Sequence, residues 1–262
     1  MIRAAALVLV LLAWAGVAYG NRALEVMNPV LLPTPGEVVA VAVTLARDGS
    51  LEWHLAVSSV RIVEGFGLAA VAALGLGLLV ALYTPARLML EPVIEFVRPI
   101  PPLAFLPMFL VWFGLGETSK VAFIAYTTFF PMFVGITASL LRVDVMLLRA
   151  AASLGASRRE LLRRVVLPAA LPGIVVALRL GFGLAIFVIV GAEFMGADAG
   201  LGNLIMEGRV FFNPAQIVMG ALVLGALGSS VNALLLATER RDRKSTRLNS
   251  SHSRASRMPS SA

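Results

Sequence analysis

Residues 148–168 read LRAAASLGASRRELLRRVVLP and form a basic stretch between two very apolar segments. Gly155 suits the C-terminus of a helix, because a left-handed conformation is needed there and a Cβ is disfavoured. Ser157 and Glu160 have the spacing of a capping box, in which each side chain satisfies a backbone N–H at the start of a new helix. One face of that helix is apolar, formed by Leu161, Leu162, Val165 and Val166. Pro168 marks the end of the segment. The stretch therefore predicts two short amphipathic helices at a bend on the surface of a membrane protein, a shape suited to docking a partner.

The composition excludes an ordinary soluble protein. Apolar residues make up 59% of the 262 residues and charged residues 14%, which exceeds what a soluble core of this length needs. The charges lie between long uncharged runs, which predicts an all-α, polytopic transmembrane helical bundle. Much of the net charge of +7 falls in short loops and the C-terminal tail, which favours membrane lipid over nucleic acid as its partner. With no cysteine and two histidines, no disulfide or thiolate metal site is possible, and a histidine-based metal site is disfavoured.

The hydrophobic runs predict about six membrane spans. Their expected bounds are Ala4–Tyr19, Val63–Tyr83, Glu91–Phe113, Lys120–Leu141, Leu171–Phe194 and Ile217–Ala237. The first is short and preceded by Arg3, so it is either a signal peptide cleaved near residues 13–15 or an anchor that stays in the membrane. The second alternative is favoured because more spans follow.

The distribution of basic residues predicts the orientation of the chain. One inter-span loop carries Arg142, Arg149, Arg158, Arg159, Arg163 and Arg164. With six spans, the same side also holds Arg3, Arg87, Arg240 and Arg241. The opposite loops are poorer, with Arg22, Arg47, Lys120 and Arg209. Because positive loops stay inside, both termini and the hairpin of this multi-pass membrane protein are expected in the cytoplasm.

Three regions follow from these spans. Residues 1–54 comprise the first span and an external connector, in which residues 31–54 predict a turn and then a short interfacial helix. That helix either contacts a partner protein outside the membrane or simply lies on the bilayer. Residues 55–241 form a transmembrane core with the hairpin at 144–168. Residues 242–262 are polar, Ser-rich and aperiodic, which predicts disorder, and they resemble translated sequencing-adapter read-through rather than native coding sequence.

The third span is unusually rich in proline. Residues 98–107 read RPIPPLAFLP. Proline removes backbone donors, and in hydrocarbon those losses must be repaired by protein or by cavity water. Broken helices in transporters often line the substrate pathway, so Pro101, Pro102 and Pro107 are candidate pathway residues. A kink that serves packing alone is the alternative.

The hairpin also resembles a known family. Its residues Arg149-Ala150-Ala151, Gly155 and Val165-x-Leu167-Pro168 have the spacing of the "E-A-A, three residues, G, nine residues, I-x-L-P" loop of ABC-importer permease subunits. The resemblance implies a type I ABC-importer permease fold in which this loop docks into the ATP-hydrolysing subunit. Arg149 stands where the family motif has an acid, so a salt bridge from that acid is not expected here. An ordinary basic cytoplasmic loop is the alternative.

The proline-rich span extends this resemblance. Together with Trp112-Phe113-Gly114-x-Gly116-Glu117, residues 98–107 resemble the taurine, aliphatic-sulfonate and nitrate importer permeases, as do Leu32-Pro33-Thr34-Pro35 and residues 191–202. The resemblance implies a homodimer in the inner membrane that works with an ABC ATPase subunit and a periplasmic or tethered substrate-binding protein, which is the partner that the external helix within residues 31–54 would contact. It also implies no cofactor and no catalytic residue in this chain. The implied substrate is a small sulfonate such as taurine, with nitrate or another small nutrient as the alternative.

Two charged residues near span ends are candidates for the transport pathway. Glu193 ends the fifth span, and a carboxylate at that depth usually faces a cavity or a partner. A solvated position at the outer rim is the alternative, and a lone acid would repel an anionic substrate. Arg179, within the same span, suits an anion or a buried pair, although its long side chain also reaches the cytoplasmic surface by snorkelling.

Two functions of other classes compete with an ATP-driven importer. A stand-alone, gradient-driven secondary transporter would show inverted repeats and ionisable groups at mid-membrane. The sequence has no clear repeat and few such charges, and a secondary transporter needs no docking hairpin. A membrane-embedded enzyme would need a cluster of His, Cys or carboxylate residues, which the sequence lacks.

Overall fold

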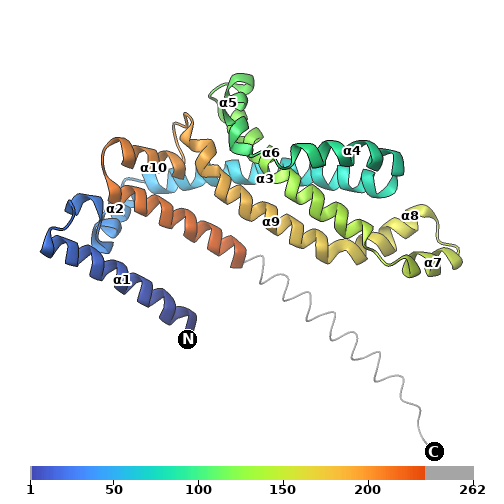
Figure 1. Cartoon of the computed structure of the whole chain (residues 1–262), viewed down its shortest axis with the longest axis horizontal. Coiled ribbons are helices and arrows are strands. Elements are labelled where there is room, and N and C mark those ends of the chain that lie inside the picture. Colours follow the sequence, from blue (N-terminus) through green and yellow to red (C-terminus); the bar gives the residue numbers. More distant parts are fainter. Residues whose placement is uncertain (1, 234–262) are drawn as a thin grey trace, which may run out of the picture. The chain divides into compact units, whose positions relative to one another are not determined.

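The computed structural model describes residues 2–233, which contain helices and no strands. The expected tail at 242–262 and the end of the sixth expected span lie outside the described residues. The chain divides into two units, residues 1–224 and residues 225–262, and the sites below all lie in the first. The main helices (Figure 1) are α1 (Ile2–Leu24), α2 (Pro35–Arg47), α3 (Ser50–Leu82), α4 (Thr84–Val97), α5 (Pro102–Phe113), α6 (Glu117–Leu141), α7 (Val145–Ser153), α9 (Leu167–Phe194), α10 (Leu201–Val210) and a last helix at Pro214–Ala233.

The described helices confirm a polytopic membrane bundle, although six spans is only an approximate count. Four helices are long and apolar enough to cross a membrane by themselves: α3, α6, the segment Arg158–Phe194 and Pro214–Ala233. A fifth span arises if α4 and α5 are counted together. The first expected span corresponds to α1, whose apolar part, Val8–Leu24, is shorter than these helices.

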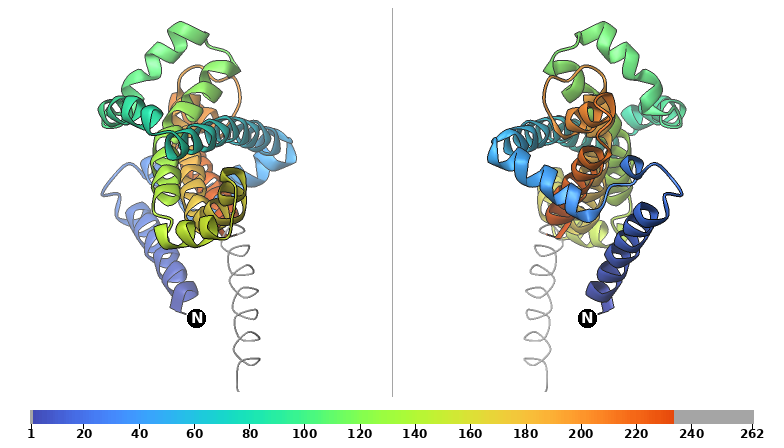
Figure 2. Two further views of the ribbon diagram at one scale, coloured as in Figure 1. Left: turned by 90° about the vertical axis from the view of Figure 1, so that its right-hand side faces the viewer. Right: turned by 90° about the vertical axis from the view of Figure 1, so that its left-hand side faces the viewer.

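Proline explains why the third expected span is broken. The axes of α4 and α5 differ by 100° (Figure 2), and the break lies at residues 98–101. Pro101 occupies the N-cap of α5 and Pro102 its first turn, where the missing N–H costs nothing. The residue before a proline is pushed away from helical geometry, so consecutive prolines separate the two helices. The sequence prediction of a broken helix is therefore confirmed.

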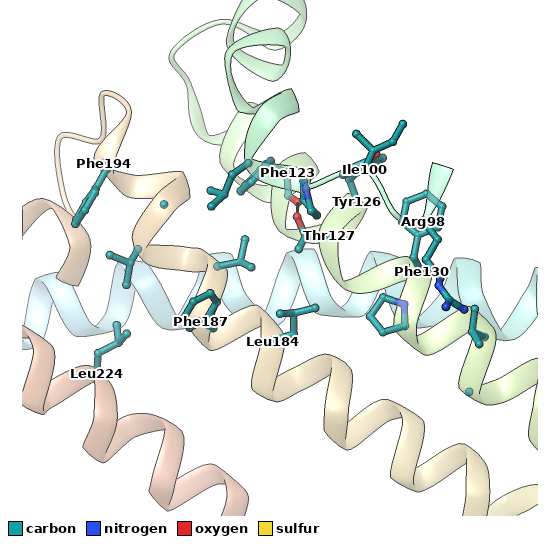
Figure 3. A pocket seen from close by; sticks show the side chains of 18 of the residues that line it. Arg98, Ile100, Phe123, Tyr126, Thr127, Phe130, Leu184, Phe187, Phe194 and Leu224 are labelled. Atoms are coloured by element: carbon teal, nitrogen blue, oxygen red, sulfur yellow. Dashed lines mark hydrogen bonds between the residues drawn. The ribbon is translucent and has the colours of Figure 1, made fainter. Parts of the chain in front are cut away.

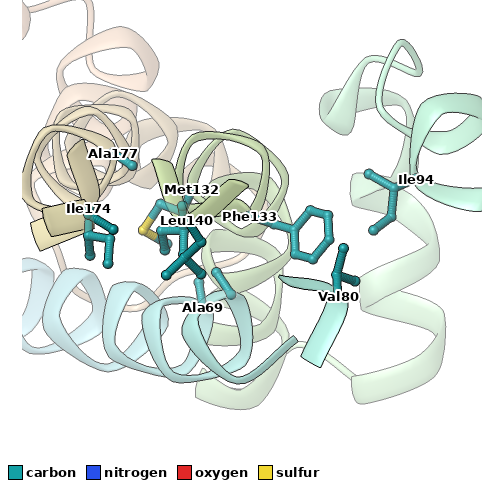
Figure 4. Packing of buried hydrophobic residues seen from close by; sticks show 11 residues of the cluster. Ala69, Val80, Ile94, Met132, Phe133, Leu140, Ile174 and Ala177 are labelled. Atoms are coloured by element: carbon teal, nitrogen blue, oxygen red, sulfur yellow. The ribbon is translucent and has the colours of Figure 1, made fainter. Parts of the chain in front are cut away.

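The core of the first unit lies between α3, α6 and α9. Small residues of α3, Ala69 and Ala73, pack against Met132, Phe133 and Ile136 of α6, as Figure 4 shows in part. From α9, the buried side chains are Ala170, Ile174 and Ala177. Small side chains allow close approach of helices in lipid, where dispersion contacts rather than water exclusion hold them together.

Glycines extend this close packing at some positions and not at others. A Cβ on Gly181 would overlap the Met132 side chain, and one on Gly220 would lie 2.7 Å from Ile205. Gly183, by contrast, has no such neighbour within 4 Å. A tight contact between α3 and α6 lies at Gly65, where a Cβ would be 2.7 Å from the Ile124 side chain and 3.0 Å from a backbone oxygen.

The connector after α1 is fixed by specific hydrogen bonds. The Trp14 indole donates to the Pro33 carbonyl at 3.1 Å, and Asn21 exchanges two hydrogen bonds with Met27. Thr34 and Glu37 form a capping box at the start of α2, so the predicted turn and short helix are present. The Thr34 N–H and the Arg22 guanidinium both bind the Glu37 carboxylate and lower its pKa.

The Gly65 contact gives a matched pair of stability tests. We expect Gly65→Ala to lower the stability of the full chain in detergent by about 1–3 kcal/mol, because the added methyl group overpacks the α3–α6 contact. Gly67→Ala, two residues along the same helix, meets nothing within 4 Å and should leave the stability unchanged or slightly higher. Thermal unfolding of both variants measures the difference. Equal melting temperatures would show that this contact is not tight.

Candidate functional site

The structure contains the predicted hairpin and its caps. Asp144 caps α7 by accepting a hydrogen bond from the Met146 N–H at 2.8 Å. Gly155 has a φ of +83°, and its N–H donates to the Ala152 carbonyl at 2.9 Å. Ser157 and Glu160 then form both halves of a capping box at the start of α8 (Arg158–Glu160). The helix end at Gly155 and the helix start at Ser157 are thus confirmed.

The prediction that Pro168 ends the second helix is wrong. The short helix α8 passes into a π-helical stretch, η2 (Leu161–Val166), and then without interruption into α9. The Leu167 N–H donates to the carbonyl of Leu162, five residues back. The wider π turn accommodates the proline ring, which in a regular α-helix would clash with the carbonyl four residues earlier. The second half of the hairpin is therefore the first part of a continuous helix, Arg158–Phe194.

The two halves of the hairpin present different faces. Helix α7 buries none of its residues and exposes Val145, Met146 and Leu147. The apolar face predicted for the second half is instead half-buried, and Val166 and Leu167 pack against the core. The Arg163 and Arg164 side chains are exposed. The surface open to a partner therefore consists of α7, the Gly155 turn and the arginines.

The predicted coupling residues are distributed along this surface. Arg149, Ala150 and Ala151 lie on α7, and Arg149 forms no ion pair within the described part of the chain. Ser157 and Glu160 cap the second helix, and Val165, Leu167 and Pro168 lie at the junction of η2 with α9. Their role in coupling stays a prediction.

At the opposite end of α9 (Figure 1) lies a cluster of charged and polar groups, here called the outer cluster because the sequence predicts that this end faces outward: His54, Ser58, Arg61, Glu117, Lys120 and Glu193. All of these residues are buried except Glu117, whose side chain is 61% exposed. The Arg61 guanidinium donates to Glu193 Oε1 at 2.7 Å and to both oxygens of Glu117 at 2.5 and 2.6 Å. Lys120 lies 3.6 Å from Glu117. Two cations thus face two carboxylates, and the cluster is electrically balanced.

Glu193 is a structural anchor in this cluster. Its Oε1 accepts hydrogen bonds from Ser58 and Arg61, each at 2.7 Å, and its Oε2 accepts one from the Gly202 N–H at 2.7 Å. The carboxylate thereby joins the end of α9 to α3 and to the first turn of α10. Both of its oxygens are satisfied, and it does not line the large pocket described below. The sequence singled out Glu193 but missed Arg61, because the expected second span began two residues after it.

The outer cluster also holds the loop between α9 and α10. His54 Nδ1 accepts a hydrogen bond from the Gly200 N–H at 2.9 Å, and the Ser58 hydroxyl accepts one from the Leu201 N–H at 2.8 Å. Arg61 donates in addition to the Ala199 carbonyl. Glycine is required at residue 200, since φ is +126° and a Cβ would overlap the Glu193 carboxyl group.

This arrangement predicts a large effect of neutralising Glu193. We expect Glu193→Gln to lower the stability of the full chain by about 3 kcal/mol, the lower end of the cost of breaking a buried pair, because Glu117 still neutralises Arg61. Asp198→Asn, at an exposed position five residues later, is the matched control and should be neutral. Thermal unfolding in detergent compares the two variants. A Glu193→Gln protein as stable as the control would contradict the anchoring role.

A pocket of about 990 Å³ opens between the α4–α5 break, α6, α9, α10 and the last helix (Figure 3). Its walls are mainly aromatic and aliphatic, including Phe123, Tyr126, Phe130 and Phe187. Arg98 lies at one end, near Phe130, and Phe194 and Leu224 lie at the other. Of the predicted pathway residues, Pro102 lines this pocket, whereas Pro101, Pro107 and Glu193 do not. Arg179 is half-buried on α9 and does not line the pocket either.

Comparison with known proteins identifies the family. Residues 73–244 match the family model described as "Binding-protein-dependent transport system inner membrane component". The chain belongs to this family. It is therefore a multi-pass permease subunit of an ABC importer, a transport subunit rather than an enzyme.

Three relatives indicate the range of this permease group. The taurine transport system permease protein TauC of Escherichia coli is 36% identical over 83% of this chain and 81% of its own length. The putative aliphatic sulfonates transport permease protein SsuC of Bacillus subtilis is 34% identical over 83% of this chain and 79% of its own length. The bicarbonate transport system permease protein CmpB of Synechococcus elongatus is 31% identical over 69% of this chain and 66% of its own length.

Solved permease structures share the fold. An amino acid ABC transporter crystallised with histidines has a TM-score of 0.59 and 22% sequence identity, covering 77% of this chain and 97% of its own. The inward-facing MetNI methionine ABC transporter has a TM-score of 0.54 and 18% identity, covering 68% and 92%. These likenesses concern the fold alone, and they place it among the ABC-importer permeases.

Proposed function

We propose that this permease moves a small sulfonate of the taurine type across the inner membrane, driven by ATP hydrolysis in a partner subunit. The observation that carries the substrate class is the 36% identity to a taurine permease over most of both chains, together with the aliphatic-sulfonate relative. A small inorganic anion such as bicarbonate or nitrate is the second candidate, favoured by the bicarbonate relative.

The proposed assembly contains two copies of this chain, two ABC ATPase subunits and a periplasmic or tethered substrate-binding protein. Both termini and the hairpin face the cytoplasm, which follows from the basic residues of the hairpin loop. The hairpin binds the ATPase through the exposed face of α7 and its arginines. The outer end of the bundle, with the outer cluster and α2, faces the binding protein and the lipid headgroups.

The continuity of α8, η2 and α9 supplies a mechanism for coupling. A 37-residue helix is about 55 Å long, so one rigid element runs from the docking surface, past the pocket, to Glu193. Displacement of the hairpin by the ATPase therefore moves Leu184, Phe187 and Gly191, which line the pocket. The ATPase changes access to the pocket only if it binds the two conformations of the permease with different affinity.

Reconstitution tests the proposed function. The chain in proteoliposomes with its ATPase and binding protein should take up taurine with ATP consumption that depends on loaded binding protein. The permease alone should hydrolyse no ATP. If the complex takes up nitrate or bicarbonate with ATP consumption but does not take up taurine, the mechanism is supported and the proposed substrate is refuted. Uptake by the permease alone, driven by an ion gradient, would overturn the assignment.

The Gly155 turn should be required for coupling rather than for folding. A valine at a φ of +83° is strained by about 1 kcal/mol or more, which displaces α7 relative to α8. We therefore expect Gly155→Val to insert into the membrane normally but to lose co-purification with the ATPase and to lose uptake.

Gly49→Val is the matched control for this variant. Gly49 also has a positive φ, +70°, and at both glycines a Cβ would meet no other atom within 4 Å, but Gly49 lies before α3, away from the hairpin. The control imposes a similar backbone strain and should leave ATPase capture intact. Normal capture and uptake by Gly155→Val would refute the coupling role of the hairpin.

A further inference from the structure

One charged residue lines the pocket: Arg98, which is exposed at the break between α4 and α5. The pocket wall on α6 is formed by Phe130, Pro131, Val134 and Gly135, near the middle of a helix that crosses the membrane. Arg98 lines the pocket at this level (Figure 3). An ionised side chain at mid-membrane is costly, so such residues face a cavity and mark a ligand or an ion path.

Arg98 has no counter-ion in the described part of the chain. None of the residues that line the pocket is acidic. On the neighbouring helix α4, Glu91 is paired with Arg87, and Glu95 forms no ion pair with Arg98. At the outer end, Glu193 and Glu117 are neutralised by Arg61 and Lys120. Among the described residues, Arg98 is therefore the one charged residue of the pocket wall, and no acidic residue pairs with it.

The rest of the pocket wall suits the aliphatic part of a small amphiphilic anion. Phe123, Phe130 and Phe187 offer apolar surface for a short aliphatic chain, and Tyr126 and Thr127 bring hydroxyl groups to the wall. Arginine presents a planar fork of donors that matches the oxygen pairs of sulfonate, carboxylate or phosphate groups. A volume of about 990 Å³ greatly exceeds a two-carbon sulfonate, which leaves room for water and for easy release.

We propose that this pocket is a transient binding site for the substrate anion, with the Arg98 guanidinium holding its sulfonate group and the aromatic wall contacting its aliphatic part. The proposal rests on the function proposed above and adds a determinant of specificity within the permease itself. The break between α4 and α5 places Arg98 at this depth, because a straight helix through residues 84–113 would direct it differently.

Binding is tested on the full-length chain in lipid nanodiscs, with trifluoromethanesulfonate as a fluorine-labelled probe. The wild-type protein should broaden the ¹⁹F line of the probe, and taurine should reverse the broadening. Arg98→Gln should weaken this binding about tenfold or more, whereas Arg98→Lys, which keeps the charge, should lose less. Arg47→Gln, at the exposed end of α2 and outside the pocket, is the control and should bind like the wild type.

The proposal would be overturned if the wild type and Arg98→Gln broadened the ¹⁹F line of the probe equally. It would also be overturned if the wild type did not broaden the line, which is the result expected if lipid or a second copy of the chain fills the pocket. The transport assay separates this proposal from the proposed function. If the wild-type complex imports taurine and Arg98→Gln imports it equally well, the Arg98 site is refuted and the importer stands. If the wild-type complex imports no taurine, the proposed substrate is refuted, and the ¹⁹F measurement alone decides the anion site.

Discussion

The buried ion pair between Arg61 and Glu193 is the interaction on which the outer half of this permease depends. It joins residues 132 positions apart in the chain, on α3 and α9, and it is shielded from solvent on both sides. Removing two such charges from water is costly unless hydrogen bonds satisfy the remaining donors and acceptors. Ser58, Glu117, the Gly202 N–H and the Ala199 carbonyl supply those bonds. The same groups therefore fix the ends of three helices and the loop between α9 and α10.

The second constraint is the continuity of the helix that ends at this pair. The π turn of η2 leaves room for the ring of Pro168 at the start of α9. The helix therefore continues from the hairpin into α9 without a break. The apolar face of η2 is anchored on the core, while α7 remains exposed. One helix with continuous backbone hydrogen bonding thus connects the hairpin with the pocket wall and the outer cluster.

The sequence predicts correctly those features that depend on contacts between residues close together in the chain. The Gly155 helix end, the Ser157–Glu160 capping box and the break at the prolines each depend on residues within a few positions of one another, and the structure contains all three. Pro168 does not end the helix, although proline usually does, because the π turn that precedes it continues the helix. Arg61 was missed because its partner lies far away in sequence, and no periodic pattern encodes such a pairing. The pocket likewise needs the 100° bend between α4 and α5, whose angle no residue pattern specifies.

The outer cluster and the pocket differ in charge: the first is balanced and the second is positive. In the outer cluster, the acid that would repel an anion is neutralised by Arg61, and the second acid lies between Arg61 and Lys120. In the pocket, no acid balances Arg98. In the orientation and pathway proposed above, an anion that passes the outer end would meet a neutral region first and the cationic Arg98 second. A cation would gain nothing at the first region and would be repelled at the second. In the proposed pathway, this order of charges favours anionic over cationic substrates.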